Sequence, residues 1–210
     1  MTLSTEPIIE RRVLLRDVPW ETYEQLLRDL QGQRVFLTYD RGSLEIMSPS
    51  PQHEKIGKYI SRMVEAFTLE RRIPIVGLGN TTWKKPAELR GLEADECYYI
   101  AKAEWAKGRE EFDLLVDPPP DLAIEVDVTS SSIDKEAIYA SLGVPELWRY
   151  ENERLQYLRL AGGIYLSTPT SVHLPELPRG IVETFARRRG ESDDTTMMLE
   201  FLNWVKTQSA

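Results

Sequence analysis

The 210-residue sequence is almost free of cysteine: Cys97 is the only one, so an internal disulfide is impossible. A composition of this kind is typical of a reducing compartment. The sequence also lacks any apolar run near the ~18 residues that a membrane span needs, and its first residues lack the apolar core of a signal peptide. We therefore expect a cytoplasmic protein without a membrane partner.

An excess of basic residues is also missing, because 26 Lys and Arg stand against 34 Asp and Glu, a net charge of −8. This balance argues against a protein that coats nucleic acid, which would be basic. It leaves open an enzyme that acts on nucleic acid, since an acidic metal site contributes negative charge of its own. The length and the 41% hydrophobic fraction suit one globular domain, which we expect to span residues 1–210.

The hydrophobic patterning predicts a mixed α/β fold. The predicted helices cover residues 20–30, a long segment after the break at 48–52 with an apolar stripe from Ile56 to Phe67, and residues 133–142 and 196–206, with a further charged segment at 101–112. The predicted strands are a hairpin at 34–48, segments at 73–79, 92–101 and 121–128, and a second hairpin at 146–160.

The strand at 121–128 carries acids at alternate positions. In a strand, Leu122, Ile124, Val126 and Val128 share one face, while Asp121, Ala123, Glu125 and Asp127 share the other. Two carboxylates roughly 6–7 Å apart raise each other's pKa unless something compensates the charge. Water on an exposed edge would do so, and so would a divalent cation.

Two further residues favour the cation. Asp95 lies in another strand-like segment and would converge with Glu125 if the two strands were neighbours. Lys135 opens the helix after the acidic strand and can fold back over the strand end. Carboxylates that hold a metal and a lysine that orients water are the parts needed to hydrolyse a phosphodiester. A solvated edge strand remains an equal alternative from these residues alone.

Four stretches resemble the Uma-two family, a former domain of unknown function described as a putative restriction endonuclease and placed in the PD-(D/E)XK nuclease superfamily. They are GSLEIMSPSPQHEKI, LEADECYYI, PPDLAIEVDVTSSSIDKEAIYASLGVPELWRY and LQYLRL, and they fall within residues 34–160. The resemblance implies a restriction-endonuclease-like core over about 34–160, a central mixed β-sheet flanked by helices. An N-terminal helix and hairpin, and a C-terminal extension at 161–210, would be added to it.

The same resemblance implies a site in which Asp95 and Glu125 bind Mg²⁺ or Mn²⁺. The motif would place its lysine two residues after Glu125, where this chain has Asp127. We therefore expect Lys135 to be the substitute, with Asp127 as an extra ligand or as the partner of Lys135. Possible additional site residues are Asp121, His53 and Glu45.

Three functions follow. The first is a metal-dependent DNA endonuclease in which Lys135→Ala abolishes cleavage but leaves folding nearly intact. The second is a non-catalytic module associated with nucleic acid, with a degraded nuclease site. The third, a carboxylate-pair hydrolase of sugars, ranks last because acids on one strand face the same way. For an endonuclease we also expect a homodimer, with the hairpin at 147–160 and the C-terminal segment as candidate surfaces.

Overall fold

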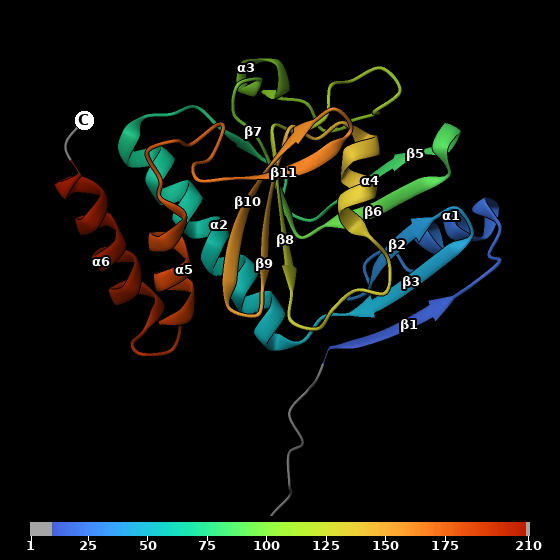
Figure 1. The fold of residues 1–210 in the computed structure, drawn as a ribbon, viewed down its shortest axis with the longest axis horizontal. Helices are drawn as coiled ribbons and strands as arrows, with labels where there is room; N and C mark the ends of the chain where they lie inside the picture. The colour runs from blue at the N-terminus through green and yellow to red at the C-terminus, as the bar shows by residue number, and fades with distance from the viewer. Residues whose placement is uncertain (1–9, 209–210) are drawn as a thin grey trace, which may run out of the picture.

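The structure is a computed structural model that describes residues 10–208 and contains two β-sheets with helices around them (Figure 1). One sheet has the strand order β1-β3-β2-β6-β5 and the other β11-β10-β9-β8-β7-β4. The strands are β1 Arg11–Leu15, β2 Phe36–Asp40, β3 Ser43–Ser48, β4 Val76–Gly77, β5 Thr81–Lys85, β6 Arg90–Ala94, β7 Glu96–Tyr99, β8 Leu122–Asp127, β9 Glu146–Glu151, β10 Arg154–Ala161 and β11 Ile164–Thr168. The helices are α1 Trp20–Asp29, α2 Pro51–Arg71, α3 Ala103–Ala106, α4 Lys135–Leu142, α5 Arg179–Arg187 and α6 Asp194–Thr207, with the 3₁₀ turn η1 at Pro86–Glu88.

The six-stranded sheet is mixed, because β8 runs parallel to β9 while its other pairs are antiparallel. Figure 1 shows α2, α5 and α6 stacked along one side of this sheet and α4 on the other. Leu122, Ile124 and Val126 of β8 pack with the first group, whereas Ala123 packs with Ile138 and other residues of the α4 layer. Strand β8 is therefore buried on both faces.

The five-stranded sheet is antiparallel throughout and has α1 against it. Its small core joins Tyr23 of α1 to Leu37, Tyr39 and Leu44 of the β2–β3 hairpin. The chain leaves this sheet at the end of β6 and enters the other sheet at β7, and the single residue between the two strands is Asp95. The crossing places Asp95 at the junction of the sheets.

Local sequence explains the two helices that border this junction. Helix α2 begins after Ser50, whose hydroxyl accepts a hydrogen bond from the backbone N–H of His53 at 3.1 Å. Helix α4 begins after Asp134, whose side chain accepts from the N–H of Ala137, and it ends at Gly143 with a φ of 80°. Both starts therefore fix the backbone of the first turn, from which the side chains of His53 and Lys135 project.

The mixed α/β fold predicted from the sequence is confirmed, including the central mixed sheet flanked by helices and the N-terminal helix and hairpin. Three element predictions are wrong. The charged segment at 101–112 forms only the short α3, with turns on either side of it and no regular structure at residues 109–112. The segment at 92–101 is two strands in different sheets, and the C-terminal part holds a second helix, α5, before α6.

Two further observations concern surfaces. No helix within residues 10–208 is long and apolar enough to cross a membrane. The aromatic residues of the β9–β10 hairpin point inward, with Trp148, Tyr150 and Tyr157 all fully buried. The hairpin therefore does not present an aromatic face to a partner.

Candidate nuclease site

The acidic face of β8 lies inside the protein rather than on an open edge. Strand β8 is flanked by β7 and β9, and the side chains of Glu125 and Asp127 are 2% exposed. The prediction of a concave site is confirmed, because both residues line a pocket of about 260 Å³. The alternative of a solvated edge strand is wrong.

Glu125 is bound by two residues of α4. Lys135 Nζ forms an ion pair with Glu125 Oε1, and the hydroxyl of Tyr139 donates to Glu125 Oε2 at 2.8 Å. Lys135 and Tyr139 are four residues apart on one helix face, so one turn of α4 covers both carboxylate oxygens. The lysine that follows the acidic strand therefore does fold back over it.

The electrostatics of this pair favour a charged lysine. Burial lowers the pKa of Lys135, but Glu125, Asp127 and Asp95 outweigh burial and raise that pKa above its usual range. Burial raises the pKa of Glu125, Asp95 and Asp127 add to the rise, and Lys135 opposes it. Lys135 is thus a permanent cation at neutral pH and has no capacity to act as a base.

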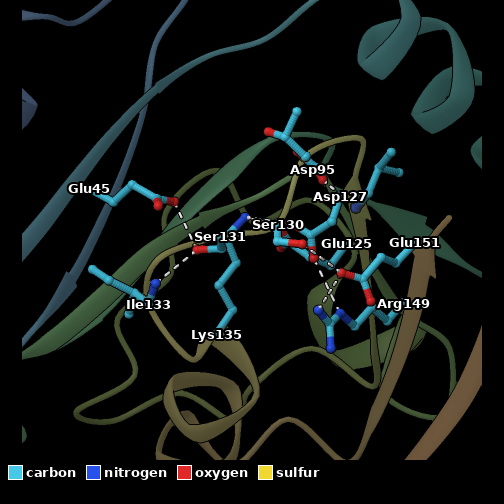
Figure 2. A network of polar contacts seen from close by, with 12 residues as sticks. Glu45, Asp95, Glu125, Asp127, Ser130, Ser131, Ile133, Lys135, Arg149 and Glu151 are labelled. Carbon is cyan, nitrogen blue, oxygen red and sulfur yellow. Dashed lines mark hydrogen bonds and ion pairs between the residues drawn. The ribbon is translucent and has the colours of Figure 1, made fainter. Parts of the chain in front are cut away.

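Asp95 reaches the same strand from the sheet crossing. Strand β7 pairs with β8 at Glu96↔Ile124, so continuing this antiparallel register places Asp95 opposite Glu125. Asp95 Oδ2 accepts from the backbone N–H of Val126 at 2.7 Å. Asp95 is also close enough to raise the pKa of Glu125, and Figure 2 shows both residues from close by, while their sharing of one ligand stays a prediction.

His53 lies next to Asp95 and to an acid, Glu10, that immediately precedes strand β1. His53 Nε2 is 3.4 Å from Asp95 Oδ1 and 4.0 Å from Glu10 Oε2. All three atoms are buried and have no hydrogen-bond partner. Burial lowers the pKa of His53, but Asp95 and Glu10 outweigh it and raise that pKa to about 8, which favours the charged imidazole.

Asp127 binds cations from three different elements. Its Oδ1 lies 3.3 Å from Arg12 and 3.8 Å from Lys135, and its Oδ2 accepts from Arg149 Nε at 3.2 Å. Figure 2 shows Arg149 reaching Asp127 and Glu151 together. The resemblance places a lysine at position 127. This chain has Asp127 there, and its carboxylate lies beside three cations, one of which is Lys135.

Glu45 of β3 fastens the loop between β8 and α4. One of its oxygens accepts from the hydroxyl of Ser131 at 2.9 Å (Figure 2). The other accepts from the N–H of Ser132 at 2.7 Å. Burial raises the pKa of Glu45, but these donors and Arg12 outweigh burial and hold that pKa below its usual value. Glu45 therefore lies beside the site as a charged support for the loop that leads to Lys135.

Asp121 is not part of this cluster. It stands at the other end of β8 and accepts from the backbone N–H groups of Ile100 and Lys102 at 2.8 and 2.9 Å, and it forms an ion pair with the Lys102 side chain. Its neighbours explain its presence on the acidic face without a functional role, and the structure separates it from the other predicted residues.

The acidic residues of the site line two different pockets. Glu125, Asp127, Lys135 and Arg149 line the pocket of about 260 Å³, whereas Asp95 lines a larger one of about 890 Å³. The larger pocket lies between α1, β2 and α2 and is lined by His53 and by basic and acidic side chains, which include Arg34, Lys58 and Glu93. The cluster thus lies between two openings.

The donors present fit a Mg²⁺ or Mn²⁺ ion only in part. Asp95 Oδ1 accepts no hydrogen bond, although His53 Nε2 lies 3.4 Å away, and Glu125 keeps further lone pairs beside its two donors. Within residues 10–208, no three His, Cys, Asp or Glu side chains are arranged as a complete metal site. Mg²⁺ is usually held by one or two carboxylates together with water and substrate phosphates, which is the role that we expect of Asp95 and Glu125.

Sequence reasoning missed Arg12, Glu10 and Arg149. Arg149 lies at a position of β9 that pairs directly with Glu125 in the parallel register, so the pairing of the two strands would have indicated it. Arg12 and Glu10 come from the far end of the chain, and no spacing in the sequence links them to β8.

The family model described as "Uma2: Putative restriction endonuclease" matches residues 20–186. Among solved structures, one similar chain is described as a putative nuclease belonging to DUF820 from Anabaena variabilis. It is 14% identical, with a TM-score of 0.45, and the match covers 79% of this chain and 90% of that chain. A search of curated proteins found no match.

Proposed function

The chain belongs to the Uma2 family of putative restriction endonucleases, and we propose that it is a metal-dependent endonuclease that hydrolyses phosphodiester bonds of DNA. The observation that carries the proposal is the buried ion pair of Glu125 and Lys135, with Asp95 bonded to the same strand and close enough to raise the pKa of both. Two carboxylates that can hold a cation, with a lysine beside one of them, can support phosphodiester hydrolysis.

Asp95 and Glu125 would hold Mg²⁺ or Mn²⁺, and the bound cation would polarise the phosphate and lower the pKa of a water molecule. Lys135 contributes a fixed positive charge, since its raised pKa keeps the ammonium protonated. From α4 this ammonium can donate a hydrogen bond to the attacking water or to the phosphate oxygen on which charge develops. Tyr139 and Asp127 keep Lys135 and Glu125 in place.

A second candidate is a nucleic-acid-associated or regulatory module without catalysis. Asp127 favours it, because the motif lysine is absent at that position and three cations already surround the carboxylate. Such a module would bind nucleic acid but would not turn it over.

The proposal includes a cytoplasmic location and a homodimer, since two sites related by a two-fold axis suit the two strands of a duplex. Because the aromatic residues of the β9–β10 hairpin are buried, the C-terminal helices are the better candidate for the dimer surface. Leu199 of α6 is 56% exposed there.

The testing experiment is nicking of a supercoiled plasmid by the wild type with Mg²⁺, with Mn²⁺ and with a chelator. We expect nicking only with a cation and its loss in Glu125→Gln. Glu146→Gln is the matched control, because Glu146 is an equally buried glutamate on the adjacent strand β9. It is bound by Trp148 and His173 and pairs with Leu122, at the opposite end of β8 from Glu125 and Asp127.

Nicking that persists in the chelator or in Glu125→Gln would contradict the proposed site. A wild type that binds no cation and cleaves neither DNA nor RNA would favour the non-catalytic module instead.

A further inference from the structure

The N-terminal strand β1 lies outside the family match at residues 20–186, yet it contributes to the candidate site. It forms the edge of the five-stranded sheet and pairs with β3 (Figure 1). Its residues alternate, so that Arg11, Val13 and Leu15 are exposed while Arg12 and Leu14 point inward. The inward face of this strand brings a guanidinium to the junction of the sheets.

Arg12 contacts four groups there. Its guanidinium lies 2.6 Å from Glu45 and 2.7 Å from Glu10, reaches Asp127 at 3.3 Å, and donates to the hydroxyl of Thr129 at 3.1 Å. The side chain is 9% exposed. Glu45 belongs to the five-stranded sheet and Asp127 to the six-stranded sheet, so one side chain joins the two sheets at the site.

We propose that Arg12 is a positioning residue of the candidate nuclease site, an inference that rests on the proposed function. Two chains of contacts lead from Arg12 to Lys135. Through Glu45 it holds the loop at Ser131 and Ser132 that precedes α4. Through Asp127 it holds a carboxylate that lies 3.8 Å from the ammonium of Lys135.

The geometry requires arginine rather than any cation. A guanidinium offers five donors in a rigid plane, and Arg12 uses Nε and both terminal nitrogens on different partners. A lysine at this position keeps the charge but has one nitrogen to share among three carboxylates. A neutral residue leaves Glu10, Glu45 and Asp127 buried near one another without this counter-charge.

The test compares Arg12→Gln, Arg12→Lys and the control Arg11→Gln, which alters the exposed neighbour on the same strand. The first readout is amide hydrogen exchange of Ser132, whose N–H is bonded to Glu45, with the central amides of β10 as an internal reference. In Arg12→Gln the charged hydrogen bond from Arg12 to Glu45 is lost, so we expect the exchange rate of the Ser132 amide to rise about tenfold. The exchange rates of the β10 amides should not change. Arg11→Gln should leave both unchanged.

The second readout is plasmid nicking, in which Arg12→Gln should lower kcat with little change in KM and Arg12→Lys should not restore it. If Arg12→Gln does not fold, Arg12→Lys carries the test, since it keeps the charge. Unchanged exchange at Ser132 in the folded variant overturns the positioning role. The two proposals can also fail separately. If the amide of Ser132 exchanges faster in Arg12→Gln but the wild type does not cleave DNA, the positioning role is supported and the nuclease proposal is rejected.

Discussion

Replacing Lys135 by methionine tests the buried ion pair at the centre of the site. Methionine has a similar length and volume, so the change removes the charge with little loss of packing. The side chain of Lys135 is 9% exposed and that of Glu125 is 2% exposed, so water cannot replace the missing ammonium without reorganisation. Tyr139 is then the remaining donor to Glu125.

The cost follows from the burial of both partners. Breaking a buried ion pair by removing one partner costs about 3 to 5 kcal/mol of unfolding free energy. The unfolding free energy of a typical domain is about 5 to 15 kcal/mol, so the variant should be markedly less stable than the wild type yet still fold. The sequence-based expectation that Lys135→Ala leaves folding nearly intact is therefore replaced by a substantial loss of stability.

The loss should depend on pH. Burial raises the pKa of Glu125 and Lys135 opposes the rise, so without Lys135 this pKa rises further above the ordinary value of about 4.3. A carboxyl group whose pKa is raised in the folded state binds its proton more tightly when folded. Its contribution to stability is complete below the ordinary value and is lost as pH rises through the folded pKa. The variant should be closest to wild type near pH 5 and furthest from it near pH 8.

Urea denaturation of the wild type, Lys135→Met and Lys135→Met/Glu125→Gln at both pH values measures this. The double variant has no buried charge at Glu125, so we expect it to recover most of the stability at pH 8. A Lys135→Met variant within about 1 kcal/mol of wild type at pH 8 would refute the reasoning, since that is the range of exposed pairs. A larger deficit at pH 5 than at pH 8 would do the same.

Two further predictions concern other parts of the chain. Burial raises the pKa of Asp121, but Lys102 and the N–H of Ile100 outweigh it and hold the pKa below its usual value. Asp121→Asn should therefore cost about 1 to 3 kcal/mol at pH 7, and the deficit should shrink as pH falls through that depressed pKa; a deficit that denaturation finds equal at pH 7 and pH 3 would contradict this. Sedimentation should give twice the chain mass of 24.2 kDa at micromolar concentration, and a single-chain mass would count against the dimer.

The acidic strand and its helix could be predicted from the sequence because the information is local. Alternation with a period of two assigns Glu125 and Asp127 to one face, and helical spacing places Lys135 and Tyr139 on one side of α4. The turn between strand and helix is short enough that the lysine returns to the strand end. Asp95 was expected near Glu125 only if their two strands were neighbours, and the structure shows that β7 pairs with β8.

The second sheet could not be predicted in the same way. The segment at 92–101 reads as one strand, but it changes sheets at Asp95, and a change of sheet leaves no mark in hydrophobic periodicity. Arg12 belongs to a short charged edge strand, and its partners Glu45 and Asp127 are 33 and 115 residues away. Such contacts depend on tertiary packing. The residues that support the site therefore could not be predicted from the sequence, whereas Glu125 and Lys135 could.

The most direct test of the central claim is a crystal structure of the wild type soaked with Mn²⁺, with anomalous scattering used to locate the ion. The account predicts one peak in contact with the carboxylates of Asp95 and Glu125, which Glu125→Gln should weaken and Glu146→Gln should leave unchanged. A peak bound elsewhere in the chain, or none at a Mn²⁺ concentration that supports cleavage, would contradict it.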